Sequence, residues 1–115
     1  MQYLLLIYDD EKKWAAMSQA EVGALIADYN KFTADITASK HLVGANRLQS
    51  VANATTVRVR DGKAQMTDGP FAETREQLGG YYLIEAKNLD EATAIAARIP
   101  SAKLGSIEVR PLHSM

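Results

Sequence analysis

Two short segments of this 115-residue chain are apolar at every position rather than at every second one. Residues 3–8 read Tyr-Leu-Leu-Leu-Ile-Tyr, and residues 81–84 read Tyr-Tyr-Leu-Ile. Such runs are typical of strands that are buried on both faces. A chain with two of them needs apolar material on both sides of its sheet, and no other feature of the sequence restricts the fold as strongly.

Two amphipathic helices are predicted between these and other strands. Ser18 and Glu21 form a capping box, and an apolar stripe at helical spacing follows over residues 22–36. We expect this helix to end near Lys40, where no glycine is available to close it, so this end is predicted to be frayed or strained. A second helix, with its own N-cap and apolar stripe, is predicted over residues 88–99.

The remaining segments predict strands and a hairpin. Residues 41–48 and 106–110 are expected to be strands, and residues 9–17 to be a polar connector. Residues 55–60 alternate cleanly before Asp61-Gly62, and the chain returns over residues 63–67, which is a strong hairpin signal.

The order of these elements predicts a single domain over residues 1–115 with an α+β fold. Two right-handed βαβ units give a ferredoxin-like βαββαβ antiparallel sheet, with an accessory β-hairpin and both helices on one face. The open face would be a larger apolar patch than monomers usually expose. We therefore expect a homodimer that buries the helix-free sheet face.

Composition excludes several classes of protein. Thirteen basic and fourteen acidic residues give a net charge of −1 without clustering, which argues against direct nucleic-acid binding. The absence of cysteine excludes disulfides and thiolate metal sites, and no spacing of His, Asp and Glu matches a metal site, so we expect neither metal nor cofactor. No run is long enough to span a membrane, and we expect a cytoplasmic protein.

Residues 66–82 contain three glycines, one proline and four charged residues between two apolar segments. Pro70 stiffens the backbone at one point, with Asp68 just before it and Phe71 just after it. A carboxylate beside an aromatic ring on a constrained loop would suit the wall of a small pocket. Alternatively, Asp68 hydrogen-bonds its own turn amides and Phe71 packs into the core. The residues leave both interpretations open.

Residues 67–74, Thr-Asp-Gly-Pro-Phe-Ala-Glu-Thr, with Glu-Gln-Leu-Gly-Gly at residues 76–80, closely resemble the signature of the DGPF-motif branch of the YCII-related (YciI-like) protein family. The likeness extends to residues 3–8, 54–62, 97–100 and 108–111. The resemblance implies a dimeric α+β barrel. For function it implies less: some members are encoded beside extracytoplasmic-function sigma factors, and a His–Asp dyad has been proposed as the site in the YciI-like branch.

That dyad does not carry over to this sequence. Its histidine would lie in the first helix, and no histidine occurs between Ser18 and Lys40. His41 and His113 are isolated in the sequence. Acid–base chemistry near the motif would therefore depend on carboxylates, tyrosines or arginines.

Asp68 is the predicted catalytic base, in a cavity whose low polarity would perturb its protonation. Phe71 is expected to be a structural plug as well as a pocket wall. The predicted substrate-binding residues are Tyr8, Asp9, Gly69, Pro70, Phe71 and Glu73.

Two functions fit this sequence. One is an enzyme that catalyses proton transfer, like a lyase or isomerase, on a small organic molecule in a dimer cleft, with Asp68 as base. The other is a non-enzymatic ligand-binding or regulatory protein linked to sigma-factor-dependent transcription, with a partner patch around Arg58 and Arg60. An enclosed cavity that holds Asp68 favours the first function, and an exposed patch with an ordinary motif loop favours the second.

Overall fold

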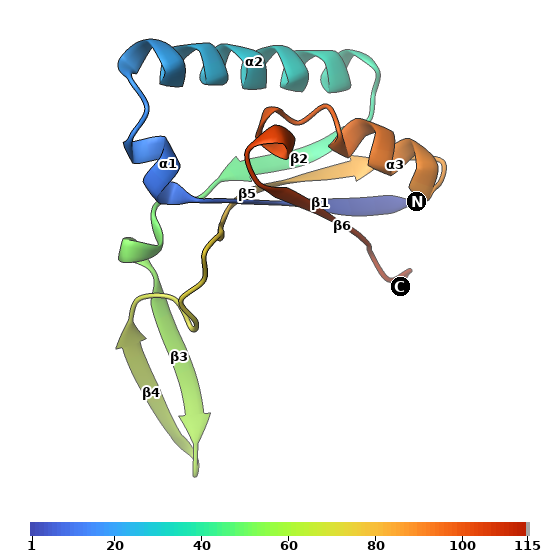
Figure 1. The fold of residues 1–115 in the computed structure, drawn as a ribbon. Helices are drawn as coiled ribbons and strands as arrows, with labels where there is room; N and C mark the ends of the chain where they lie inside the picture. The colour runs from blue at the N-terminus through green and yellow to red at the C-terminus, as the bar shows by residue number, and fades with distance from the viewer. Residues whose placement is uncertain (115) are drawn as a thin grey trace.

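The computed structural model describes residues 1–114 and has an α+β architecture in two layers (Figure 1). One layer is a four-stranded antiparallel sheet, and the other contains the two longer helices, which lie over the same face of the sheet. The sheet order is β2 (Leu42–Arg47), β5 (Gln77–Glu85), β1 (Gln2–Asp9) and β6 (Ser106–Pro111), and the covering helices are α2 (Gln19–Ala38) and α3 (Leu89–Ala96). This arrangement confirms the predicted ferredoxin-like fold.

The core lies between the sheet and the helices. Leu5 of β1 and Ile84 of β5 are fully buried there, together with Ile36 of α2. The ring of Phe32 meets that of Tyr82 edge-on, with 5.1 Å between the ring centroids. Each such side chain contributes about 1.5–3 kcal/mol by leaving water, so this one-sided core is the main source of stability.

The second apolar row of β1 and β5 points to the face that no helix covers. Leu4 pairs with Leu83 and Leu6 pairs with Tyr81, so these four side chains share the helix-free face. They are only half-buried within one chain, whereas the alternate residues of β1 are fully buried. The two continuous apolar runs are thus divided between a core and an uncovered face.

A β-bulge interrupts the pairing of β1 with β5 at the paired glycines. The register between β1 and β5 runs from Ile7 opposite Gly80 to Tyr8 opposite Leu78, which leaves Gly79 without a partner in this pair of strands. A bulge of this kind bends the strand and redirects the side chains that follow it.

Two sequence-based boundaries were wrong. The strand expected at residues 81–84 begins earlier, because β5 starts at Gln77, so the loop after β4 (Lys63–Asp68) spans only residues 69–76. The polar connector contains a helix, α1 (Glu11–Ala15), that begins where the Asp10 side chain accepts a hydrogen bond from the Lys12 backbone N–H. The N-cap signal was present in the sequence, but five residues are too few for a recognisable apolar stripe.

The predicted accessory hairpin is confirmed. β3 (Thr55–Arg60) and β4 pair only with each other, and they project from the helix-free side of the sheet (Figure 1). Asp61 and Gly62 both have positive φ, as the tight turn of a hairpin requires. Two short 3-10 helices, η1 (Val51–Asn53) and η2 (Pro100–Lys103), complete the chain, and within residues 1–114 no helix has the length and apolar character to cross a membrane.

Both ends of α2 follow from the sequence. At its start the predicted capping box is confirmed, because Ser18 and Glu21 exchange hydrogen bonds of 3.0 and 3.1 Å between side chain and backbone. At its end the His41 N–H donates to the Ile36 carbonyl and the Lys40 N–H to the Thr37 carbonyl. This is the Schellman arrangement, in which the residue in the position of Lys40 must be left-handed.

We predict that Lys40→Gly stabilises the protein. Lys40 has a φ of 64°, which crowds the Cβ of any residue other than glycine, so the change should raise the free energy of unfolding by about 1 kcal/mol. The matched control is Ala38→Gly in the last helical turn, which should lower it by about 0.5–1 kcal/mol. Urea denaturation measures both, and a loss of stability in both variants would contradict strain at Lys40.

Candidate functional site

A cavity of about 520 Å³ lies between α2 and the part of the sheet where β1 ends. Its walls come from α1, α2, β1, β2 and β5, and from the segment that follows β2. The lining residues with polar or aromatic groups used below are Asp9, Trp14, Tyr29, Thr33, Arg47 and Tyr82. The volume is in the range of cavities that hold small organic ligands.

Asp9 places a carboxylate on the wall of this cavity. It is the last residue of β1 and is only 6% exposed. Its Oδ2 accepts a hydrogen bond of 2.8 Å from the indole Nε1 of Trp14. Buried carboxylates are rare because a charge loses its hydration, so one that faces a cavity is a strong candidate for binding or proton transfer.

Two glycines create the space that Asp9 occupies. A Cβ on Gly105 would lie 2.1 Å from the Tyr8 carbonyl oxygen and 2.9 Å from the Asp9 Cα, so no side chain fits there. A Cβ on Gly79, the bulge residue, would come within 3.4 Å of Asp9 Oδ1. The backbone between η2 and β6 can therefore pack directly against the end of β1, and Oδ1 remains beside the bulge.

The short helix α1 is fixed by two contacts that hold the Trp14 indole over Asp9. The Glu11 backbone N–H donates to the Gln77 side-chain oxygen at 3.0 Å. The Glu11 carboxylate accepts from the Val51 backbone N–H at 3.2 Å. These contacts link α1 to β5 and to η1, so the hydrogen-bond donor to Asp9 is positioned from both sides.

Trp14 also connects the carboxylate to a cation. The guanidinium carbon of Arg47 lies 5.3 Å from the centre of the Trp14 ring, which is a cation–π contact. The indole N–H is bound to Asp9 while its face meets Arg47. The cavity thus presents a negative and a positive group on either side of one aromatic side chain.

Two tyrosine hydroxyls complete the polar groups of the cavity. Burial raises the pKa of Tyr29 and the charge of Asp9 raises it further, against a lowering by the hydrogen bond with Ser101. Burial also raises the pKa of Tyr82, against a lowering by its 2.7 Å hydrogen bond with Thr33. Both phenols are therefore neutral at physiological pH and act through hydrogen bonds rather than charge.

The sequence matches a known protein family over its whole length. The whole chain, residues 1–115, matches the YCII-related domain. This chain belongs to the YCII-related family. It is 39% identical, over 114 residues, to an uncharacterized protein of Rhizobium meliloti (strain 1021), an alignment that covers 97% of this chain and 92% of the relative.

A solved structure shares the fold of this YCII-related chain. It is 5-chloro-2-hydroxyhydroquinone dehydrochlorinase from Burkholderia phenoliruptrix AC1100, in complex with 2,5-dihydroxybenzoquinone. The match covers 98% of this chain and 94% of the other, with a TM-score of 0.52 and 14% sequence identity. At this identity the likeness shows the fold alone.

The residues that the sequence suggested fall into three places. Asp9 lines the cavity of the YCII-related chain, whereas Tyr8, its neighbour in β1, alternates to the helix-free face. The others lie at the base of the hairpin and in the loop after it, and none of them lines the cavity; they are Asp68, Gly69, Pro70, Phe71 and Glu73.

The motif loop is exposed rather than packed. Phe71 is 79% exposed, so the expectation that it is a plug in the core was wrong. The loop is held instead by the hairpin, because the Thr56 hydroxyl donates to the Gly69 carbonyl at 2.9 Å and Arg58 donates to the Phe71 carbonyl at 3.4 Å. Asp68 is exposed too, and among the described residues no backbone amide donates to its carboxylate, so it does not cap its own turn.

Most of the cavity wall could not be recognised from the sequence. Trp14 lies in the segment predicted to be a polar connector, and Tyr29 is one member of the apolar stripe predicted for residues 22–36. No sequence pattern around Arg47 indicated that it would line a cavity. A single tryptophan in an otherwise polar segment was the one available sign that this segment packs against something. Among the described residues no three His, Cys, Asp or Glu side chains come together as a metal site would require.

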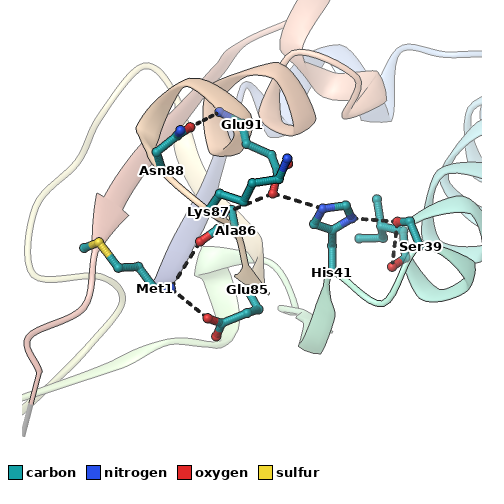
Figure 2. A network of polar contacts seen from close by, with 9 residues as sticks. Met1, Ser39, His41, Glu85, Ala86, Lys87, Asn88 and Glu91 are labelled. Carbon is teal, nitrogen blue, oxygen red and sulfur yellow. Dashed lines mark hydrogen bonds and ion pairs between the residues drawn. The ribbon is translucent and has the colours of Figure 1, made fainter.

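His41 lies in a separate polar network at the other end of the sheet (Figure 2). Its Nδ1 is 2.6 Å from the Ser39 hydroxyl, and its Nε2 is 3.2 Å from the Glu91 carboxylate. The same network includes the N-terminal amine of Met1, which binds Glu85 at 2.7 Å. These contacts join the starts of β1, β2 and α3, which is a structural role.

We predict that Glu91 contributes stability that depends on pH. The hydrogen bond from the Lys87 backbone N–H, aided by His41 and the Lys87 charge, lowers the pKa of Glu91 from its ordinary value of 4.5. A carboxylate with a lowered folded-state pKa adds stability above that ordinary value and loses it as the pH falls through the folded-state pKa. Glu91→Gln should therefore be less stable than the wild type at pH 7, and the difference should shrink below pH 4.5.

Lys87→Ala is the control for this effect, because it keeps the backbone N–H that is the largest cause of the shift. It should retain most of the pH dependence of the wild type in urea denaturation at pH 7, 5 and 3. A Glu91→Gln variant whose deficit is constant over this range would show that Glu91 acts through packing instead.

Proposed function

We propose that this YCII-related protein binds a small organic molecule in the cavity beside Asp9 and catalyses a proton transfer of the lyase or isomerase type. The observation that carries the proposal is a buried carboxylate on the wall of a cavity of about 520 Å³. Aromatic rings, neutral phenols and a guanidinium surround the same space. Such a mixture suits a hydroxylated ring better than a purely apolar ligand.

Asp9 is the base in this proposal. The indole N–H of Trp14 holds Oδ2, which orients the carboxylate and leaves Oδ1 beside the Gly79 bulge to take a proton. Negative charge that develops on the ligand would be stabilised by Arg47. The proton then returns to another atom of the same molecule in an isomerisation, or a leaving group departs in an elimination.

Asp68 is the alternative candidate for the base. Its carboxylate is exposed at the base of the hairpin, so this assignment needs a dimer cleft that closes over it. The motif at residues 67–74 supports membership of the DGPF-motif branch, which we include in the proposal. It does not by itself favour one carboxylate over the other.

The structural relative supports small-molecule chemistry for this fold. That protein is a dehydrochlorinase of a hydroxylated, chlorinated ring, and its solved complex holds a dihydroxybenzoquinone. A reaction in which a proton and a chloride leave a small ring requires groups that accept a proton and stabilise an anion. Asp9 and Arg47 are groups of these two kinds in the present chain.

A regulatory function remains the alternative, as a non-enzymatic ligand-binding protein linked to sigma-factor-dependent transcription. It is favoured by the projecting hairpin, which exposes Arg58 and Arg60 on its polar face, and by the exposed position of Asp68 at the base of the hairpin, outside the cavity. In that case ligand binding in the cavity would occur without turnover, and the hairpin would contact the partner.

We predict that a neutral diol, hydroquinone, binds in the cavity and that its binding depends on Asp9. Replacing the charged acceptor by an amide in Asp9→Asn should weaken binding about tenfold, because a hydrogen bond to a charged group is stronger than one to a neutral group. Trp14 is the chain's single tryptophan and lines the cavity, so its fluorescence reports occupancy directly. Calorimetry under reducing conditions gives the affinity.

Asp10→Asn is the matched control, since an asparagine can still cap α1 and Asp10 lies outside the cavity lining. Its affinity for hydroquinone should equal that of the wild type. If Asp68→Asn loses binding while Asp9→Asn keeps it, Asp68 is the functional carboxylate. Absence of any Trp14 response to millimolar hydroquinone would count against the cavity as a site for such ligands.

The proposal includes a homodimer through the helix-free face, and we predict that Leu6→Asp abolishes it. Leu6 points to that face, away from the core, and a carboxylate buried there without a partner would be very costly. Sedimentation equilibrium at micromolar concentration should give twice the chain mass for the wild type and one chain mass for the variant. Ala27→Asp, on the exposed surface of α2, is the control and should stay dimeric. A monomeric wild type would refute the dimer.

A further inference from the structure

The hairpin is an amphipathic ribbon. The pairs Val57 with Met66 and Val59 with Ala64 lie on one side of it, which we call the apolar face of the ribbon. The intervening pairs, Arg58 with Gln65 and Arg60 with Lys63, lie on the other side. Met66 is 74% exposed, and Val57 and Val59 are each 59% exposed, so the apolar face has almost no cover within the chain.

The two faces of the ribbon differ in their contacts with the rest of the chain. The loop after β4 is bound to Thr56 and Arg58, which belong to the polar side. The apolar face lies opposite to this loop. Because an isolated two-stranded ribbon is at best marginally stable in water, an ordered ribbon with an apolar face is expected to pack on another surface.

The solvent-exposed area of the chain indicates how much surface a partner could cover. The chain exposes 8059 Å², whereas a compact monomer of its mass exposes roughly 6,200 Å². Its radius of gyration is 16.1 Å, against roughly 13 Å for a compact domain of this length. The excess of roughly 1,900 Å² is within the area that each partner of an obligate dimer buries.

The direction of the ribbon identifies the partner. It projects from the side of the sheet that carries Leu4, Leu6 and Leu83, which is the side opposite to α2 and α3 (Figure 1). Sheets pack face to face about 10 Å apart, and a six-residue strand is about 20 Å long. A second copy packed on the helix-free face would therefore lie within reach of the ribbon along its whole length.

We infer that the β3–β4 hairpin is a dimerisation arm, whose apolar face (Val57, Val59, Ala64 and Met66) packs on a second copy of this chain. The inference rests on the homodimer of the proposed function and adds a second contact to it. Two-fold symmetry makes each arm contact the other chain, so every substitution in the arm acts twice per dimer. The polar side, with Arg58, Arg60 and Lys63, stays in solvent.

The test compares one added charge on each side of the same strand. Met66→Glu should raise the dimer dissociation constant about a hundredfold, because two carboxylates per dimer would lose their hydration. Gln65→Glu adds the same charge to the polar side and should change it by less than about threefold. Both side chains are exposed in the single chain, so each variant should keep the circular dichroism of the wild type.

Photocrosslinking gives a second readout that does not depend on a weakened dimer. The chain has no cysteine, so Ala64→Cys and Lys63→Cys can each carry one benzophenone label, on the apolar and the polar side respectively. Irradiation should produce covalent dimers from the first and few from the second. Addition of Leu6→Asp to the first should abolish them.

The outcomes distinguish failure of the arm contact from failure of the dimer itself. If Leu6→Asp dissociates the dimer while Met66→Glu matches Gln65→Glu and neither label crosslinks, the arm is refuted and the sheet interface stands. If the wild type is monomeric, both the arm and the sheet interface are refuted. Dissociation by Met66→Glu together with crosslinking from residue 64 alone supports the arm.

Discussion

The four-stranded sheet carries α2 and α3 on one face and no helix on the other, and the remaining features depend on this asymmetry. Packing against the helices buries one row of β1, centred on Leu5, and this row supplies most of the apolar stabilisation. The other row, with Leu4 and Leu6, contributes little until something covers it. The sequence therefore encodes two apolar surfaces, of which a single chain can satisfy only one.

The same asymmetry decides where chemistry can occur. On the covered side α2 lies over the end of β1, and the absence of side chains at Gly79 and Gly105 leaves room for Asp9, which is only 6% exposed. Trp14 then connects the carboxylate to Arg47, so the charges at the cavity are held apart by an aromatic ring. On the uncovered side the hairpin and its motif loop form a separate exposed surface. The proposed ligand site and the proposed dimer interface thus lie on opposite sides of one sheet.

Local patterns were sufficient for the fold. Caps, periodicity and turn residues located α2, α3 and the hairpin, because each of these depends on neighbours in sequence. The cavity could not be found in the same way. Asp9 is a candidate site residue only because the fold brings Trp14, Tyr29 and Gly105 around it, and of these only Trp14 is near it in the sequence. The conspicuous motif around Asp68 lies in a loop beside the hairpin rather than in the cavity.

The central question is which carboxylate, Asp9 or Asp68, contacts a ligand. Carbon-13 NMR of the side-chain carboxyl groups, recorded while hydroquinone is added to the wild-type protein, tests this without any substitution. We expect the Asp9 signal to shift with saturation, and those of Asp10 and Asp68 to stay in place. A shift confined to Asp68, with Asp9 unchanged, would contradict the assignment of the cavity as the functional site.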